Sequence, residues 1–180
     1  LSFAVRELCC DAGIMVTASH NPAKYNGYKA YGPDGCQMNL EMSEYVLSLI
    51  NKVDIFDGVK RADFDKAIAD GSIEYISDEV INKYYDCVVN EQINPEVLKK
   101  ANLKLVYTPL NGTGNKPVRE ILKRIGVTNV TVVKEQEKPD GNFPTCPYPN
   151  PEIRQVFEEG LKMKKNVSED LIKLAEELAI

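Results

Sequence analysis

Residues 12–22 read Ala-Gly-Ile-Met-Val-Thr-Ala-Ser-His-Asn-Pro, and this stretch decides the fold class. The apolar run from Ala12 to Val16 predicts the end of a short buried strand, and Asn21-Pro22 predicts a turn. Ser19 and His20 are therefore expected on a tight loop at the carboxyl end of the strand. Ligands of open α/β sheets bind at this edge, so the stretch predicts an α/β protein with a site on the loop.

Ser19 and His20 place a nucleophile beside a base. A serine hydroxyl is a poor nucleophile unless a neighbouring group takes its proton or stabilises the charge that it gains. His20 is the only histidine in the chain, and imidazole changes its charge near neutral pH. Two isolated residues of these types are more often a loop hydroxyl and a solvated imidazole, so the pair alone leaves both interpretations open.

The residues around and after this pair favour the functional interpretation of Ser19 and His20. The loop 17–22 (Thr-Ala-Ser-His-Asn-Pro) and the segment 25–29 (Tyr-Asn-Gly-Tyr-Lys) resemble, in composition and spacing, the active-site signature of the α-D-phosphohexomutase family of phosphoglucomutases and phosphomannomutases. The resemblance implies that Ser19 carries a phosphoryl group, gives it to a hexose phosphate and recovers it from the other oxygen of a hexose 1,6-bisphosphate. It implies that His20 and Lys29 are the remaining catalytic residues, as acid and base in an order that stays open.

The resemblance also implies the ligands of the site. Thr17, Asn21 and Asn26 would bind the phosphosugar substrate. The implied cofactor is Mg²⁺, held by the phosphorylated Ser19 and by the carboxylates of an Asp-x-Asp-x-Asp-Arg loop. That loop is absent from the sequence, which ends instead in residues 166–180 with apolar positions at helical spacing. Either the loop follows residue 180 or this tail replaces it.

Lys29 suits phosphoryl transfer by its charge. A phosphoserine carries nearly two negative charges, so a cation and the N–H groups of a tight loop stabilise it. Asn26-Gly27 supplies a bend that could bring Lys29 back over the loop. An arbitrary lysine is usually a solvated surface residue, but the spacing of Lys29 from the serine loop favours the functional interpretation.

Charge and hydropathy exclude other classes of partner. The net charge is -5, and acidic and basic residues are interspersed, so nucleic acid is not an expected partner. No apolar run is long enough to span a bilayer, and the first residues do not have the charged, apolar, small-residue pattern of a leader, so we expect a cytoplasmic protein without a membrane partner. The oligomeric state is not predicted.

The cysteines indicate a reducing environment. Their number is odd and no CxxC pair is present, which argues against both a disulfide framework and a zinc site. We expect reduced and mostly buried thiols at all five positions, which are Cys9, Cys10, Cys36, Cys87 and Cys146.

A polar, turn-rich middle divides the sequence into two partial phosphohexomutase-type domains. Residues 1–75 are expected to form the carboxyl-terminal part of a phosphoserine-bearing domain 1, and residues 76–180 a domain 2 that stops short of the metal loop. The fold class is α/β, with mixed or parallel sheets and helices on both faces.

Periodicity, caps and turn residues predict the elements of each domain. In the first, helices are expected over 40–50 and 64–69 and strands over 53–56 and 73–76. In the second, helices are expected over 78–89, 116–125 and 151–164, with Ser77 and Asn150 as caps of the first and last, and strands over 103–107 and 130–134. The glycine-rich loop 108–114 is expected to be a tight turn rather than a phosphate site.

The expected function is the interconversion of hexose 1-phosphate and hexose 6-phosphate by the parent protein. Glucose is the preferred sugar because the segments 31–38, 107–115 and 139–152 look most like a bacterial phosphoglucomutase. The chain alone is expected to be nearly inactive. One alternative is a non-catalytic folding or interaction module. Another is a serine hydrolase using Ser19 and His20, which is disfavoured because adjacent side chains diverge and no G-x-S-x-G elbow is present.

Overall fold

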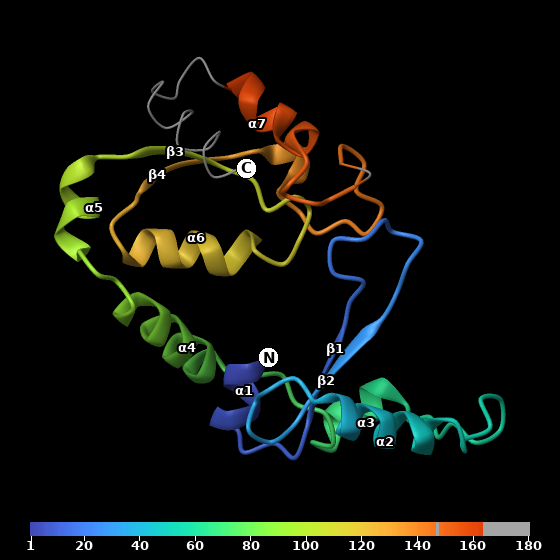
Figure 1. Cartoon of the computed structure of the whole chain (residues 1–180). Helices are drawn as coiled ribbons and strands as arrows, with labels where there is room; N and C mark the ends of the chain where they lie inside the picture. Colours follow the sequence, from blue (N-terminus) through green and yellow to red (C-terminus); the bar gives the residue numbers. More distant parts are fainter. Residues whose placement is uncertain (147, 164–180) are drawn as a thin grey trace. The chain divides into compact units, whose positions relative to one another are not determined.

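The computed structural model describes residues 1–146 and 148–163, and Figure 1 shows the order of their elements along the chain. The chain divides into two compact units. The first contains residues 1–16 and 28–84, and the second contains residues 17–27 and 85–180. We describe each unit by itself, and the predicted division between residues 75 and 76 stays a prediction.

The first unit begins with helix α1 (Ser2–Glu7) and a hairpin of β1 (Gly13–Val16) and β2 (Tyr28–Tyr31). The strands are antiparallel, with Gly13 opposite Tyr31 and Val16 opposite Tyr28. Helix α1 covers only the start of β1, where a methyl group on Gly13 would lie 2.6 Å from Val5 Cγ2. The predicted strand is confirmed, but the prediction that it is buried was wrong because its last three residues are exposed.

Side-chain caps start the next two helices, α2 (Leu40–Ile50) and α3 (Phe64–Ala69). Asn39 Oδ1 accepts from the backbone N–H of Met42 at 2.9 Å, and Asp63 Oδ1 accepts from that of Lys66 at 2.9 Å. Each cap satisfies a donor that the first turn leaves unpaired. Both helices have their predicted bounds.

The predicted strands over 53–56 and 73–76 were wrong, because local hydrogen bonds replace a ladder in both segments. Asp54 Oδ1 accepts from the backbone N–H groups of Phe56 at 2.8 Å and Asp57 at 2.9 Å. Such side-chain bonds give the backbone an alternative to a strand. The N–H of Ile73 donates to Ala67 O at 3.0 Å and folds the chain back onto α3.

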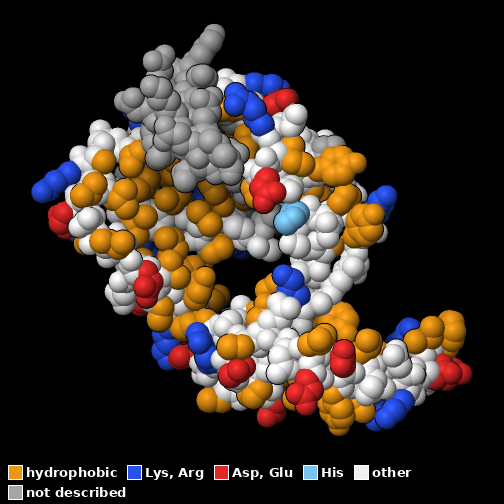
Figure 2. All heavy atoms as spheres, in the orientation of Figure 1, with side chains coloured by type: hydrophobic (Ala, Val, Ile, Leu, Met, Phe, Trp, Pro, Cys, Tyr) orange, Lys and Arg blue, Asp and Glu red, His pale blue; other side chains and the backbone are white. Residues whose placement is uncertain are grey.

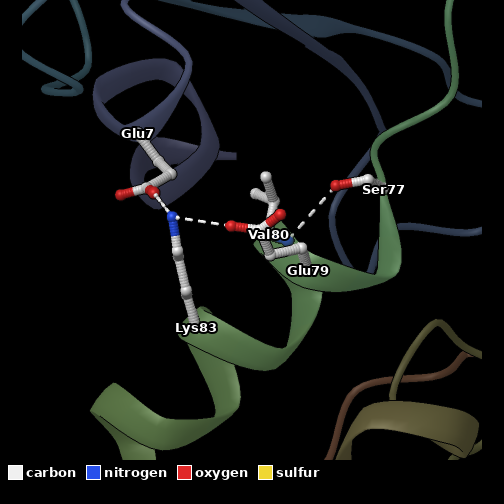
Figure 3. Close-up of polar contacts among 5 residues, drawn as sticks. All are labelled: Glu7, Ser77, Glu79, Val80 and Lys83. Carbon is white, nitrogen blue, oxygen red and sulfur yellow. Dashed lines mark hydrogen bonds and ion pairs between the residues drawn. The ribbon is translucent and has the colours of Figure 1, made fainter.

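Helix α4 (Asp78–Asn90) begins at its predicted cap, since the N–H of Val80 donates to Ser77 Oγ at 3.4 Å. In Figure 3, Lys83 of α4 points at the carboxylates of Glu7 and Glu79. Its Nζ lies 2.7 Å from Glu7 Oε1 and 3.3 Å from Glu79 Oε1. The hydrogen bonds to Glu7 and then Glu79 raise the pKa of Lys83. This ion pair joins α4 to α1 within the first unit.

The second unit contains a parallel pair of strands, β3 (Lys104–Tyr107) and β4 (Asn129–Val132), connected by helix α6 (Asn115–Arg124). Lys104 is opposite Asn129 and Tyr107 is opposite Val132. This confirms the predicted strand-helix-strand unit, and together with the antiparallel hairpin it confirms an α/β fold. Helix α5 (Pro95–Ala101), which precedes β3, and α1 were not predicted.

The carboxyl-terminal part of the second unit has a 3-10 turn η1 (Lys134–Gln136), a second one η2 (Arg154–Phe157) and helix α7 (Glu158–Lys162). Figure 1 shows α6 and α7 on opposite sides of the β3–β4 pair. A methyl group on Gly160 of α7 would lie 3.6 Å from Val133 Cγ2, so the helix packs closely here. Buried apolar side chains in this unit include Val127, Val133, Cys146 and Val156.

The prediction of one helix over 151–164 was wrong. Asn150 Oδ1 accepts from the N–H of Glu152 at 3.0 Å, which caps a turn rather than a helix. Ile153 is then extended, with φ -93° and ψ 114°, so helical structure begins only at η2. The helical spacing noted over 166–180 lies outside the described residues.

Thiol burial also differs from the prediction. All five cysteines are free, as expected, but Cys9, Cys36 and Cys87 are exposed, Cys10 is half-buried and only Cys146 is buried. The exposed thiols lie on the turn after α1, on the turn after β2 and on α4. Within the described part of the chain, no helix is long and apolar enough to cross a membrane.

Candidate active-site loop

The loop 17–27 connects β1 to β2 and is closed at its base by backbone contacts. The N–H of Thr17 donates to Gly27 O at 2.9 Å. A methyl group on Gly27 would lie 3.2 Å from Thr17 O, which is closer than a comfortable carbon–oxygen contact. Glycine therefore allows the two ends of the loop to approach, directly beyond the last strand pair.

Ser19 occupies a turn inside this loop and is exposed. Its φ of 59° lies in the left-handed region, where a residue with a β-carbon is strained. Its N–H donates to Thr17 Oγ1 at 2.9 Å, and the N–H of Asn21 donates to Ala18 O at 3.1 Å. Such strain costs on the order of 1–3 kcal/mol and is concentrated at functional sites. The loop thus holds the hydroxyl on a tight turn, open to solvent.

His20 lies beside Ser19 at the surface, where Figure 2 shows the imidazole exposed. The distance between Ser19 Oγ and His20 Nδ1 is 3.5 Å. A nucleophile and its base are usually about 2.6–3.2 Å apart, so this contact is longer than the usual distance between them. The imidazole is exposed on the same turn as the Ser19 hydroxyl.

Lys29 lies on β2, opposite Met15 of β1, and is exposed. It belongs to the first unit, whereas Ser19 and His20 belong to the second. The structure therefore brings Ser19 and His20 together and leaves the predicted role of Lys29 a prediction. The loop itself also carries a lysine, since Lys24 Nζ is 5.3 Å from the centroid of the Tyr25 ring. The adjacency of Lys24 and Tyr25 in the sequence is the feature from which this contact could have been predicted.

Two of the predicted substrate-binding residues use their side chains to shape the loop. Thr17 Oγ1 accepts from the N–H of Ser19, and Asn26 Oδ1 accepts from the N–H of Gly27 at 2.8 Å. Asn21, the third, is exposed two residues after Ser19. Contact of these three residues with a sugar phosphate stays a prediction.

The described residues do not fit a magnesium ion. Mg²⁺ takes six oxygen ligands in near-octahedral geometry, with carboxylates among them. Within residues 1–146 and 148–163, no group of three or more His, Cys, Asp or Glu side chains could hold a metal. A phosphorylated Ser19 alone would supply only one of the ligand groups that the ion needs, so the reaction steps proposed below do not include the metal.

The glycine-rich loop 108–114 is a tight turn that packs closely against Tyr107. A methyl group on Gly114 would lie 2.7 Å from the Tyr107 hydroxyl oxygen, so glycine is required for this contact. Burial raises the pKa of Tyr107. Arg119 on α6 is held by Glu137 at 2.6 Å and by Asn115 at 3.2 Å. These contacts favour the predicted tight turn over an anion site.

Comparison with known proteins gives consistent matches along the chain. The family model of phosphoglucomutase/phosphomannomutase alpha/beta/alpha domain I matches residues 1–55, and that of domain II matches residues 82–174. A phosphoglucomutase of Staphylococcus saprophyticus is 37% identical over 174 residues, and one of Staphylococcus haemolyticus is 36% identical over 177 residues. Each alignment covers 96% of this chain and 31% of the relative.

A solved structure described as a phosphomannomutase of Thermus thermophilus has the same fold. It superposes with a TM-score of 0.62 at 23% identity and covers 91% of this chain and 33% of that one. The chain thus spans about a third of the length of the proteins that it matches.

Proposed function

Because the chain belongs to the phosphoglucomutase/phosphomannomutase family, we propose that the full-length protein is a phosphohexomutase and that Ser19 carries the transferred phosphoryl group. The observation that carries this proposal is the loop 17–27. It presents one strained, exposed serine on a turn that its own backbone closes. The hydroxyl is accessible to a ligand and is not engaged by a short hydrogen bond to His20.

The proposed reaction has two transfers. In the first, the bond between phosphorus and Ser19 Oγ breaks, phosphorus bonds to the free hydroxyl oxygen of a hexose monophosphate, and the hydroxyl proton passes to a base. In the second, the resulting bisphosphate returns its other phosphoryl group to Ser19 Oγ, and an acid protonates the oxygen that is released. Phosphate therefore moves between C1 and C6 with no net gain or loss.

His20 and Lys29 are the proposed acid and base, in an order that the account leaves open. Both side chains are exposed. An ammonium group near the transferred phosphate would also offset its developing charge. Thr17, Asn21 and Asn26 are the proposed substrate contacts, and Mg²⁺ is the proposed cofactor, with its carboxylate ligands supplied by residues other than those described. A cytoplasmic location is part of the same proposal.

Glucose is the proposed sugar. The relatives from the two Staphylococcus species carry the name phosphoglucomutase and align over nearly all of this chain. The chain covers about a third of such a protein, so we expect the 180 residues alone to be nearly inactive. Turnover by the full-length protein separates a mutase from a non-catalytic folding or interaction module.

The test is steady-state turnover of glucose 1-phosphate by the full-length protein and by Ser19→Ala. Removing the residue that forms a covalent intermediate is expected to lower kcat by about 10³-fold or more. The matched control is Ser48→Ala. Ser48 is an exposed serine on α2 whose hydroxyl donates to Tyr45 O at 2.7 Å, and this variant is expected to keep its kcat.

Full turnover by Ser19→Ala would overturn the proposal. Labelling of Ser19 by an organophosphate probe, together with ester hydrolysis, would favour the serine hydrolase instead. If the unaltered full-length protein does not isomerise hexose phosphates, the non-catalytic module is favoured.

A further inference from the structure

We propose that Asn26 is a site of spontaneous deamidation, at which the side-chain amide is lost as ammonia and an acidic residue forms in the loop 17–27. The chain contains two Asn-Gly pairs, Asn26-Gly27 and Asn111-Gly112. In such a pair the glycine nitrogen can attack the asparagine side chain with little hindrance, because glycine has no β-carbon. Asn26 is exposed and Asn111 is buried, so we expect only the first pair to react in the folded protein.

The geometry at Asn26 favours the attack. Asn26 Oδ1 lies 2.8 Å from the backbone nitrogen of Gly27, so the side-chain carboxamide already faces the attacking atom. The carbonyl carbon is bonded to this oxygen, and rotation about the Cα–Cβ bond and ψ of Asn26 can bring it into the near-attack range of about 3–3.5 Å from the Gly27 nitrogen. Both residues are exposed, so water and hydroxide reach them.

The reaction balances with water as the only co-reactant. The Gly27 nitrogen loses its proton and bonds to Asn26 Cγ, and the bond from Cγ to the amide nitrogen breaks, which releases ammonia and leaves a cyclic imide. Water then opens the ring at either carbonyl. One product is aspartate, and the other is isoaspartate, whose main chain runs through the former side chain.

Asn111 is an internal control because the fold protects it. Its side chain is 5% exposed, and Nδ2 donates to Lys138 O at 2.9 Å. The N–H of Gly112 donates to Pro109 O at 2.9 Å, so the potential nucleophile is held in a backbone hydrogen bond of the turn. Asn111 can react only after this part of the unit opens, and local opening of a buried region costs free energy.

Deamidation would alter the loop that holds Ser19. Isoaspartate inserts a methylene carbon into the main chain directly before Gly27, whose carbonyl oxygen accepts the bond from Thr17 that closes the loop. Either product also adds a negative charge to the loop that carries Ser19, and like charges repel a phosphorylated serine. We therefore expect mutase turnover to fall as the protein ages. Only this consequence rests on the proposed function.

The experiment follows both asparagines in the folded full-length protein during incubation in mildly alkaline buffer. Peptide mass spectrometry measures conversion of each amide to the acid, and methylation by an isoaspartyl methyltransferase with labelled S-adenosylmethionine detects the isoaspartate. We expect Asn26 to convert about tenfold faster than Asn111 or more, because the latter reacts only from an opened state. In denaturant the two rates should become similar.

Two controls make the outcome decisive. Asn26→Gln should abolish the signal at this position, because glutamine would have to close a larger ring. A higher pH should speed conversion of Asn26, because the attacking nitrogen must lose its proton. Equal rates at Asn26 and Asn111 in the folded protein, or a lasting amide at Asn26, would overturn the proposal. This chemical readout does not depend on mutase activity, so it can succeed or fail separately from the role of Ser19.

Discussion

Ser19 has a strained backbone and an exposed side chain. The strain affects the stability of the protein, and the exposure makes the hydroxyl accessible. The φ of 59° brings its β-carbon close to a backbone carbonyl oxygen, a contact that glycine would not make. The strained conformation lowers the stability of the folded protein, and such strain is concentrated at functional sites, where it can present a reactive hydroxyl.

This strain gives a prediction for stability. Replacing Ser19 by glycine should give a protein more stable than Ser19→Ala by about 1 kcal/mol, because only glycine adopts the left-handed conformation without cost. Thermal unfolding of the two full-length variants measures the difference. Equal melting temperatures would mean that the loop relaxes to an unstrained backbone.

The cysteines allow a second test at the residue scale. Burial raises the pKa of Cys146, so less of its thiol is ionised at a given pH, and the thiolate is the form that alkylates. Exposed Cys9, Cys36 and Cys87 should react with iodoacetamide first. Peptide mapping after a short exposure at mildly alkaline pH checks the order, and all five should react in denaturant. Early labelling of Cys146 in the folded protein would contradict its burial.

At the scale of elements, the turn after α6 depends on one glycine. Gly126 has φ 91°, and a methyl group there would lie 3.1 Å from Lys99 Cγ on α5. Gly126→Ala should lower the free energy of unfolding by about 1–2 kcal/mol. The control is Gly141→Ala, where a methyl group would meet no atom within 4 Å and which should be neutral or slightly stabilising. Urea unfolding of both variants gives the comparison, and equal effects would rule out backbone strain as the cause.

A buried polar cluster joins the loop 108–114 to η1 and η2. Gln136 is fully buried, and its Oε1 accepts from Thr108 Oγ1 at 2.6 Å while its Nε2 donates to Val156 O at 3.2 Å. Asn111 adds a backbone bond of 2.8 Å to Gln136 O. This cluster fixes the two loops that follow β3 and β4.

Breaking the cluster should be costly. Gln136→Leu leaves two groups without their partner and should lower the free energy of unfolding by about 2–3 kcal/mol. The matched control, Gln155→Leu, changes an exposed glutamine of η2 and should stay within about 0.5 kcal/mol. Adding Thr108→Val to Gln136→Leu should cost less than the two single changes summed, since they share one bond. Strict additivity would contradict the cluster.

The elements that could be predicted from sequence carry their own signals. Helices α2, α3 and α4 have capping residues, and the β3–α6–β4 unit has turn residues at both ends of its helix. The segments 53–56 and 73–76 are apolar but lack a partner strand within the described residues, and a short apolar run cannot by itself distinguish a strand from a packed turn. The motif located the loop of Ser19, but the positive φ of Ser19 could not be predicted, because residues other than glycine rarely adopt this conformation.

At the scale of the whole molecule, the family models place the two parts of the chain in successive domains of one family. Residues 1–55 match domain I and residues 82–174 match domain II, and the relatives are about three times as long as the chain. The site proposed at Ser19 lies in the part that matches domain I, and its test is made on the full-length protein.

The central claim is that Ser19 accepts and donates phosphate. The most direct measurement is phosphopeptide mapping of the full-length protein after incubation with glucose 1,6-bisphosphate labelled in its phosphate. The account predicts label on Ser19, lost again when excess glucose 1-phosphate is added, and none on the exposed control Ser48. A protein that isomerises hexose phosphates while Ser19 stays unlabelled would contradict it.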